Sequence, residues 1–242
     1  MLKAIVLAAG KGSRMNSMIP KVLHEINNKT LIQHVLDVVK MCNFDRVFVV
    51  ISSNANNVIE AVKNDVIFVE QKDQLGTGHA VMQVEEYIDD IDDIIVLCGD
   101  SPLITSKTLN NIMDMHIKSN DAATIITTIL DNPMAYGRII RDNEKNIISI
   151  VEKKDANNDQ INIKEINSGI YCFKGKYLKE ALKKIQNNNK SNEYYLPDTI
   201  RIIINEGYRV GSYIVNDYTE ILGVNTQEDL VIAREILDKR NK

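Results

Sequence analysis

MLKAIVLAAGKGSRM, residues 1–15, is the stretch that decides how this chain folds. Its apolar run from Leu2 to Ala8 has no polar alternation, which is typical of a strand covered on both faces in a parallel sheet. A loop rich in glycine and serine follows and extends to about Lys21. Ligands of open α/β sheets bind outside the carboxyl ends of the strands, so this loop lies where a binding site is expected.

The next ninety residues continue the alternation of strand and helix patterns. Strands are predicted at 46–51, 66–69 and 94–98, and helices at 31–41, 56–62 and 79–87. Thr30 is expected to be the N-cap of the first of these helices. The alternation predicts an α/β fold with a Rossmann-like, mostly parallel sheet and helices on both faces.

The second half of the chain is less regular. Strands are predicted at 122–130, 138–141, 147–152, 169–173 and 209–215, and helices at 177–185, 197–206 and 227–240. The second and third of these strands flank a polar turn and indicate a hairpin, and the polar segment 153–162 is expected to be a mobile loop. Without repeats or a long linker, residues 1–225 are interpreted as one domain with a smaller second lobe, and residues 226–242 as a C-terminal helix.

Composition narrows the class of protein. The 242 residues carry a net charge of −4, so no general electrostatic attraction to nucleic acid or anionic lipid is expected. The odd number of cysteines (Cys42, Cys98, Cys172) suits reduced thiols better than disulfides or a zinc site. The N-terminus lacks a signal-peptide pattern, and no segment approaches the roughly 20 apolar residues of a membrane span, so the protein is expected to be cytoplasmic. Nothing in the sequence specifies an oligomeric state.

The loop after the first strand has the composition of a phosphate-binding loop. Small residues at Gly10 and Gly12 let backbone amides approach phosphate oxygens, while Lys11, Arg14 and Lys21 add positive charge. The loop lacks the third glycine of a dinucleotide-binding motif and the Gly-Lys-Ser/Thr of a P-loop. A plain strand-to-helix turn with solvated basic residues is the alternative.

Further polar residues follow other predicted strands. Asp100 emerges where an apolar strand ends, and such a carboxylate can hold Mg²⁺ together with substrate phosphates. Gln71 offers both a donor and an acceptor, which suits the edge of a pyrimidine base. Taken alone, Asp100 fits a turn or helix cap, and Gln71 fits an ordinary polar loop. Glu152, Asn167 and Asn225 likewise fit turn or cap positions.

No residue pattern indicates a covalent nucleophile. The histidines form no HxxxH or HxH pair, and the sequence contains no G-x-S-x-G elbow. Cys98 lies inside an apolar strand and is interpreted as a core residue.

Together these segments resemble the sugar-phosphate nucleotidyltransferase family. More narrowly, they resemble the N-terminal pyrophosphorylase (uridyltransferase) domains of the bacterial bifunctional enzymes that make UDP-N-acetylglucosamine. The matching segments are LAAGKGSRM at 7–15, PKVLH at 20–24, QLGTGHA at 74–80, GDSPL at 99–103, YGRI at 136–139, IVEKKDA at 150–156, EINSG at 165–169 and GVN at 223–225. Their order and spacing match over essentially the whole chain, which implies a nucleotide-diphospho-sugar transferase fold with a sugar-side lobe.

The resemblance also implies a reaction and a set of site residues. The reaction is Mg²⁺-dependent transfer of a uridylyl group from UTP to N-acetylglucosamine 1-phosphate, which provides a precursor for peptidoglycan. The implied nucleotide-binding residues are Leu7, Ala8, Ala9, Gly10, Gln71, Gly76 and Thr77. Arg14 and Lys21 are the implied catalytic residues, Asp100 and Asn225 the metal ligands, and Gly137, Glu152 and Asn167 the sugar-binding residues.

Two departures from the family pattern stand out. Cys98 occupies a position where the family commonly has tyrosine. The bifunctional family also continues into a left-handed β-helix with hexapeptide repeats, and nothing in this sequence resembles those repeats, so acetyl transfer is not expected of this chain. The same chemistry on glucose 1-phosphate or with another nucleotide, and a non-catalytic sugar-nucleotide sensor, are the alternatives.

Overall fold

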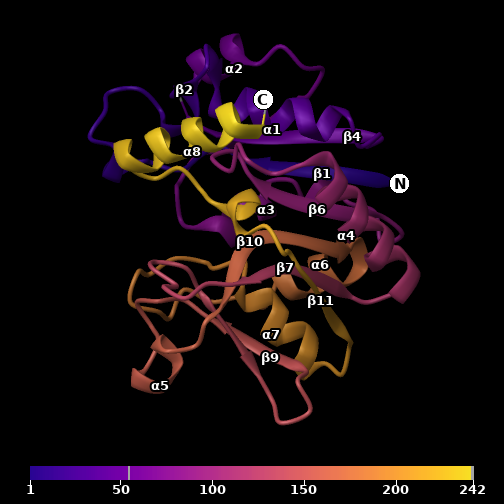
Figure 1. The fold of residues 1–242 in the computed structure, drawn as a ribbon. Helices are drawn as coiled ribbons and strands as arrows, with labels where there is room; N and C mark the ends of the chain where they lie inside the picture. Colours follow the sequence, from indigo (N-terminus) through magenta and orange to yellow (C-terminus); the bar gives the residue numbers. More distant parts are fainter. Residues whose placement is uncertain (54, 241–242) are drawn as a thin grey trace.

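The computed structural model describes residues 1–53 and 55–240. Within these residues the main sheet has nine strands, with the order β11-β7-β10-β6-β1-β4-β5, and the hairpin β8–β9 is attached to β10. Figure 1 shows the strands stacked through the middle of the molecule with helices on their flanks. Along its seven-strand central path the sheet is mixed but mostly parallel, with helices around it, which confirms the predicted fold class.

The first half of the chain builds the parallel part of the sheet. Its strands are β1 (Leu2–Leu7), β4 (Arg46–Ser52), β5 (Ile67–Gln71) and β6 (Asp93–Cys98). β1 pairs in parallel with both β4 and β6, and β4 pairs in parallel with β5. The carboxyl ends of these strands therefore lie at one edge, where the loops after β1, β5 and β6 come together.

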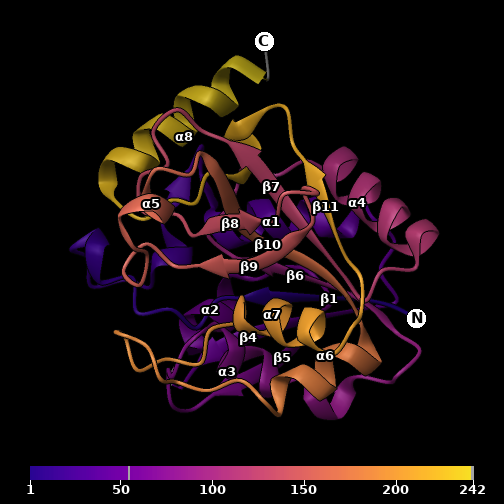
Figure 2. The ribbon, with the colours of Figure 1, turned by 90° about the horizontal axis from the view of Figure 1, so that it is seen from below.

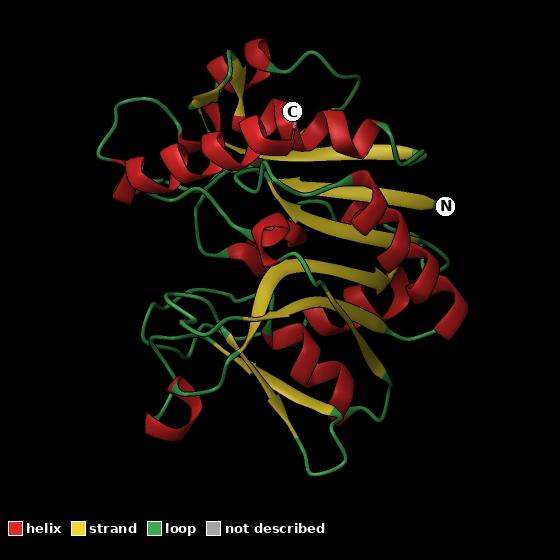
Figure 3. Ribbon diagram, viewed as in Figure 1, coloured by secondary structure: helices red, strands yellow, loops and turns green. Residues whose placement is uncertain are grey.

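The second half adds an antiparallel strand and a second lobe. β10 (Glu165–Lys174) runs antiparallel to β6 and to β7 (Ala123–Ile129), and β11 (Val210–Ile214) pairs in parallel with β7. The predicted hairpin is present as β8 (Arg138–Arg141) and β9 (Ile147–Val151), and it contacts β10 at one end. Figure 3 shows the long strand β10 bending from the central sheet into the hairpin lobe.

The helices cover both faces of the sheet. They are α1 (Leu31–Lys40), α2 (Asn56–Ala61), α3 (Thr77–Met82), α4 (Ser106–Ser119), α5 (Asn158–Ile161), α6 (Gly175–Leu182), α7 (Asp198–Asn205) and α8 (Gln227–Arg240). The hydroxyl of Thr30 accepts from the Gln33 amide, so the predicted cap of α1 is confirmed. None of the helices among the described residues is long and apolar enough to cross a membrane.

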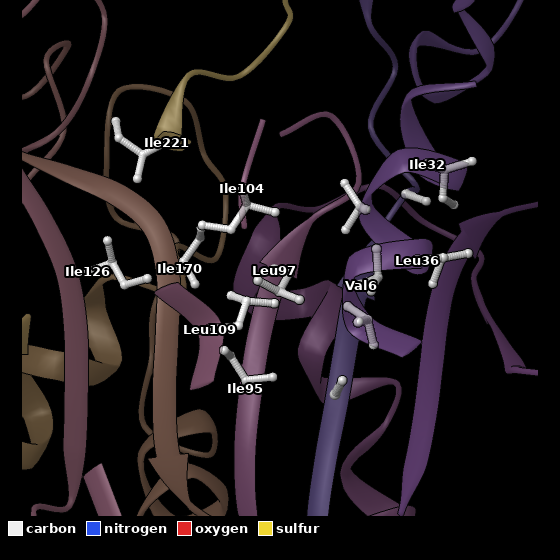
Figure 4. Packing of buried hydrophobic residues seen from close by; sticks show 14 of the residues in the cluster. Val6, Ile32, Leu36, Ile95, Leu97, Ile104, Leu109, Ile126, Ile170 and Ile221 are labelled. Atoms are coloured by element: carbon white, nitrogen blue, oxygen red, sulfur yellow. The ribbon is translucent and has the colours of Figure 1, made fainter. Parts of the chain in front are cut away.

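Alternate residues of the central strands β1, β4 and β6 belong to different core clusters. Val6, Val49 and Leu97 pack with α1 and α4 on one face, as Figure 4 shows for part of this cluster. Ile5 and Val96 pack on the other face, against residues of α3, α6 and α7. The continuous apolar runs of the sequence therefore reflect burial on both sides of the sheet.

Three sequence-based predictions about elements need correction, and one helix was missed. The helix predicted at 79–87 ends at Met82, and a separate 3₁₀ turn covers Glu85–Tyr87. The segment 153–162 contains the short helix α5, which begins with a reciprocal capping box between Asn157 and Gln160. The strand predicted at 169–173 begins four residues earlier, at Glu165. Helix α4 was not predicted, although Thr105 caps it.

A small third cluster joins the chain's two ends. Leu230 and Ala233 of α8 pack against Met15 after β1, with Leu103 and Val224 in the same cluster. Figures 1 and 2 show α8 at the periphery of the molecule. This packing brings the segment just before α8 to the carboxyl edge of the parallel strands.

Candidate functional site

Three adjoining hollows lie at the carboxyl edge of the parallel strands. The loop hollow, of about 430 Å³, is lined by the loop after β1 and by residues 71–80, together with Asn225. The lobe hollow, of about 390 Å³, is lined by residues 134–137, 167–169 and 223–229. The central hollow, of about 370 Å³, shares Leu7 with the loop hollow and Asn167 with the lobe hollow, and it is also lined by Cys98 and Tyr171. Arg14 lines all three, so the hollows adjoin one another at this side chain.

Gly12 shapes the loop after β1. Its backbone has a φ of 60°, a conformation that side-chain-bearing residues seldom adopt. A Cβ placed on Gly12 would lie 2.7 Å from the Cβ of Lys21, so the absence of a side chain lets the two ends of the loop approach each other. Lys21 is thereby directed into the hollow.

A cationic cluster lies where the hollows meet. The Lys21 ammonium pairs with the Asp100 carboxylate and donates to Asn225 Oδ1 at 3.0 Å. Arg14 Nη2 donates to the same Asn225 oxygen at 2.9 Å. Four residues from distant parts of the sequence are thus connected by hydrogen bonds at the sheet edge.

The donor set of this cluster fits a magnesium ion. A carboxylate oxygen of Asp100 and an amide oxygen of Asn225 converge on a single positive group, the Lys21 ammonium. Among the described residues there is no group of three or more His, Cys, Asp or Glu side chains that could hold a metal. Mg²⁺ needs no such cage, because it takes one or two protein ligands and completes its shell with water and substrate phosphates.

The loop after β5 forms the opposite wall of the loop hollow. Gln71 is buried, and its amide nitrogen lies 3.1 Å from the Gly76 carbonyl oxygen and 3.0 Å from His79 Nδ1. The Gln71 side chain therefore lines the hollow and also holds the loop in shape. Thr77 accepts from the Leu196 amide at 3.1 Å, which connects this loop to the second lobe.

Main-chain hydrogen bonds strengthen that connection. The Tyr194 amide donates to the Leu75 carbonyl at 2.7 Å, and the Gly78 amide donates to the Tyr194 carbonyl at 2.8 Å. A Cβ on Gly76 would lie only 2.6 Å from the Tyr194 oxygen. We call residues 75–78 together with 193–195 the clasp.

Glu152 stands between the lobe hollow and the central hollow. A Cβ on Gly137 would lie 3.1 Å from Glu152 Oε1, so the glycine leaves room for this carboxyl group. Burial, followed by the charges of Asp155 and Asp198, raises the pKa of the Glu152 carboxyl to about 7. This carboxyl group therefore changes its charge near neutral pH.

Asn167 is buried at the junction of the same two hollows. Its amide nitrogen donates to the Tyr171 hydroxyl at 2.6 Å, and its oxygen accepts from the Gly169 amide at 3.3 Å. Burial raises the pKa of Tyr171 well above its ordinary value, so the phenol keeps its proton. The Asn167 amide is thus held in one orientation.

The structure brings together most of the residues singled out from the sequence. Leu7, Ala9, Gly10, Arg14, Lys21, Gln71, Gly76, Thr77, Gly137, Glu152, Asn167 and Asn225 line the three hollows. Asp100 contacts the site through its ion pair with Lys21. Ala8 does not line these hollows, because its side chain packs into the core.

Cys98 lines the central hollow and is not purely a core residue. Burial raises the pKa of its thiol to about 12, with a further increase from the Asp100 charge. A thiol with this pKa remains protonated at neutral pH, which argues against a nucleophilic role.

Sequence reasoning missed several residues that line the hollows. They are Tyr136, Lys154, Tyr171, Glu193, Tyr195 and Asp229. Lys154 and Tyr136 lie within the IVEKKDA and YGRI segments of the family resemblance. Their place in these motifs was the one sequence signal that could have identified them. Glu193 and Tyr195 reach the site because the hydrogen bonds of the clasp bring residues 193–195 beside residues 75–78. No local sequence pattern predicts this contact.

Comparison with known proteins gives a consistent result. Residues 3–234 match the family model "Nucleotidyl transferase". The chain is 47% identical over 238 residues to "Bifunctional protein GlmU" of Clostridioides difficile (strain 630), covering 98% of this chain and 52% of that protein. It is 49% identical over 239 residues to the protein of the same name in Alkaliphilus oremlandii, covering 99% and 52%. The chain thus spans about half the length of these curated relatives.

Two solved structures share the fold. "The Crystal Structure of UDP-glucose pyrophosphorylase complexed with UDP-glucose" has a TM-score of 0.79 and 19% identity, covering 98% of each chain. A putative glucose-1-phosphate thymidylyltransferase from Bacillus anthracis has a TM-score of 0.77 and 20% identity, covering 98% of this chain and 95% of that one. At these identities the likeness concerns the fold alone.

Proposed function

Because the chain belongs to the nucleotidyl transferase family, we propose that it transfers the uridylyl group of UTP to N-acetylglucosamine 1-phosphate. The products are UDP-N-acetylglucosamine and pyrophosphate. The substrate assignment draws on the sequence identity of 47–49% to the GlmU proteins, of which this chain spans about half. We further propose that the reaction takes place in the cytoplasm, as part of the supply of amino sugar for peptidoglycan.

One observation carries the proposal: two hollows meet at a single cationic cluster. Arg14 and Asn225 line both the loop hollow and the lobe hollow. A triphosphate in the loop hollow and a sugar phosphate in the lobe hollow would bring their phosphates to this cluster. Holding two anions in reactive geometry contributes on the order of 7–11 kcal/mol toward lowering a barrier.

The nucleotide assignment uses the residues of the loop hollow. Backbone amides around Gly10 and the small side chain of Ala9 suit close approach of phosphate and ribose. The Gln71 amide and the loop at Gly76 and Thr77 face the same hollow and suit the edge of a uracil base. We place Ala8 behind this surface, where it supports the loop from the core.

The chemistry needs no covalent intermediate with the protein. An oxygen of the sugar phosphate attacks the α-phosphorus of UTP, the bond from the α-phosphorus to its bridging oxygen breaks, and pyrophosphate leaves with the electron pair. Lys21 and Arg14 stabilise the negative charge that develops on the phosphoryl oxygens and on the leaving group. Asp100 and Asn225 would hold Mg²⁺, which supplies further neutralisation of phosphate charge when bound.

The sugar assignment uses Glu152, Asn167 and Gly137. The oriented Asn167 amide can pair with polar atoms of an N-acetyl sugar, and the Glu152 carboxyl can bond to its hydroxyls. A buried polar group left without its partner costs about 1–3 kcal/mol, so an analogue lacking the acetamido group is rejected.

We also propose a simple domain organisation. Residues 1–225 form the nucleotidyltransferase domain with its sugar-side lobe, and residues 226–242 form an appended segment. Helix α8 spans Gln227–Arg240 of this segment, and residues 241–242 lie outside the described residues. The packing of Leu230 and Ala233 against Met15 supports a fixed position for that helix.

Pyrophosphate release from UTP tests the proposal. We expect release with N-acetylglucosamine 1-phosphate and Mg²⁺, with kcat/KM at least about tenfold above that for glucose 1-phosphate or glucosamine 1-phosphate. Asn167→Ala should reduce both the rate and the preference. Equal use of glucose 1-phosphate would reassign the sugar, and nucleotide binding without pyrophosphate release would contradict the enzyme function.

A further inference from the structure

The side-chain amide of Asn225 is held at both of its polar atoms. Its oxygen accepts from Lys21 at 3.0 Å and from Arg14 at 2.9 Å. Its nitrogen donates to the Gly223 carbonyl at 3.1 Å. These contacts fix which atom of the amide faces the cationic cluster.

The backbone of Asn225 is held separately, by Asp229. One oxygen of the Asp229 carboxylate accepts from the backbone amides of both Asn225 and Thr226, each at 2.9 Å. The Asp229 amide in turn donates to the Thr226 hydroxyl at 3.1 Å. Asp229 lies in the first turn of α8, next to the buried Leu230, so the carboxylate ties Asn225 to a helix packed on the core.

We propose that Asp229 is a positioning residue that fixes the Asn225 oxygen for a divalent cation. The inference rests on the proposed function of Asn225 as a magnesium ligand. Mg²⁺ demands near-ideal octahedral geometry at short distances, so a displaced oxygen is a poor ligand. Groups that orient a ligand without touching the metal commonly change metal affinity by about 10- to 100-fold.

A simple helix cap would behave differently from a positioning residue. Glu228 is also acidic and also lies in the first turn of α8, but its side chain is exposed. Loss of either acid removes one favourable charge from the helix N-terminus. Glu228 interacts with Thr226, whereas the backbone amide of Asn225 is bound by Asp229. Glu228→Ala is therefore the matched control for release of the Asn225 backbone amide.

The test compares Asp229→Ala, Asp229→Asn and Glu228→Ala in the whole chain. The first readout is hydrogen exchange of the Asn225 and Thr226 backbone amides without metal, followed by NMR. The second is Mn²⁺ binding in the presence of UTP, followed by electron paramagnetic resonance. The third is the Mg²⁺ dependence of pyrophosphate release.

We expect Asp229→Ala to accelerate exchange of both amides and to weaken Mn²⁺ binding by about tenfold. The half-saturating Mg²⁺ concentration should rise by a similar factor, with kcat at saturating Mg²⁺ within about twofold of wild type. Asp229→Asn keeps an oxygen that accepts both amides and should restore all three readouts. Glu228→Ala should match wild type in exchange of the Asn225 backbone amide, in Mn²⁺ binding and in Mg²⁺ dependence.

Several results would overturn the inference. One is unchanged exchange of the Asn225 and Thr226 amides in Asp229→Ala. Another is faster exchange with unchanged Mn²⁺ binding and unchanged Mg²⁺ dependence, which would show that Asp229 only caps the helix. An Asp229→Asn protein as impaired as Asp229→Ala would mean that charge, not position, matters.

Failure of the proposed function looks different. A wild-type protein that neither binds Mn²⁺ with UTP nor releases pyrophosphate would remove the metal role of Asn225, and with it the positioning role for that ion. If wild type is active with Mg²⁺ and all three variants give the same readouts as wild type, the positioning inference is overturned and the proposed function stands.

Discussion

Lys21 is the residue through which distant parts of the chain meet at the site. It pairs with Asp100 and donates to Asn225, which are 79 and 204 positions away in the sequence. Its side chain is only 15% exposed, as is that of Asp100, so their charges are poorly screened by solvent. A triphosphate entering the loop hollow would compete with these partners for the ammonium.

The first prediction concerns the stage at which Lys21 acts. If its charge is used mainly in the transition state, Lys21→Ala should lower kcat by roughly 100- to 1000-fold, the usual effect of removing one preorganised donor. The KM for UTP should change far less, because uniform binding does not accelerate the chemical step. Steady-state kinetics over a range of UTP concentrations measures both. A variant with a raised KM and an intact kcat would show that Lys21 only binds the nucleotide.

At the scale of elements, the clasp joins the nucleotide side of the site to the second lobe. Gly76 has a φ of 110° and leads into α3, while the facing segment leads into α7. A methyl group on Gly76 would press on the Tyr194 carbonyl at 2.6 Å and on the Glu193 Cβ at 2.9 Å. The clasp therefore closes only with glycine at this position.

The second prediction compares two glycines with positive φ. Gly76→Ala should destabilise the fold by about 2 kcal/mol or more, since backbone strain and overpacking add together. It should also weaken UTP binding, because the loop hollow includes this segment. Gly207 has a φ of 84°, but a Cβ added there would have no atom within 4 Å, so Gly207→Ala should show the strain alone and bind UTP normally. Urea unfolding and UTP titration measure the two effects, and equal losses in both variants would argue against the clasp.

Elements with a strong local signal could be predicted from the sequence. The run Leu2–Leu7 and the cap at Thr30 are local features, and both appear as expected. Helix α4 has comparable local signals, namely the cap at Thr105 and Leu109 with further buried residues at helical spacing, so it too is predictable from the sequence.

Elements that depend on distant partners were harder to predict. The first residues of β10 are mostly polar, with the buried Ile166 among them, and their strand conformation depends on pairing with β7, ahead of a bulge beside Gly169. Asn167 lies in this stretch, so its place in the site follows from tertiary pairing. The residues of the family motifs could be proposed as site residues from the sequence. The places of Glu193 and Asp229 in the site could be recognised only from the folded structure.

At the scale of the whole molecule, ion pairs and burial govern how stability depends on pH. Burial would raise the pKa of Asp92, but the hydrogen bonds from Lys3 and from the Asp89 amide, together with the charge of Lys3, lower it. The pKa of Glu165 is lowered in the same way by Arg141. Groups of this kind stabilise the fold above their unfolded pKa, and that stability is lost as the pH falls through their folded pKa. They predict acid unfolding below about pH 4.

Glu152 acts in the opposite direction. Its folded pKa of about 7 lies above the ordinary value of 4.5, chiefly because of burial. Below about pH 4.5 the carboxyl is protonated in both states and has no net effect. Between about pH 4.5 and 7 it ionises more readily in the unfolded chain, so the fold loses stability as the pH rises.

The third prediction isolates this contribution by substitution. The side chain introduced by Glu152→Gln cannot titrate. The free energy of unfolding of Glu152→Gln should therefore lack the decrease that ionisation of Glu152 causes in wild type between pH 5 and pH 7.5. The stability of wild type relative to Glu152→Gln should therefore fall by on the order of 2 kcal/mol over that interval. Urea unfolding of both proteins at the two pH values gives the difference, in which the other titrating groups cancel. The exposed Glu144 provides the control, because Glu144→Gln should follow wild type at both values. If the wild-type and Glu152→Gln stabilities instead change in parallel, the carboxyl ionises normally in the fold, and its charge near neutral pH would have to be reassigned.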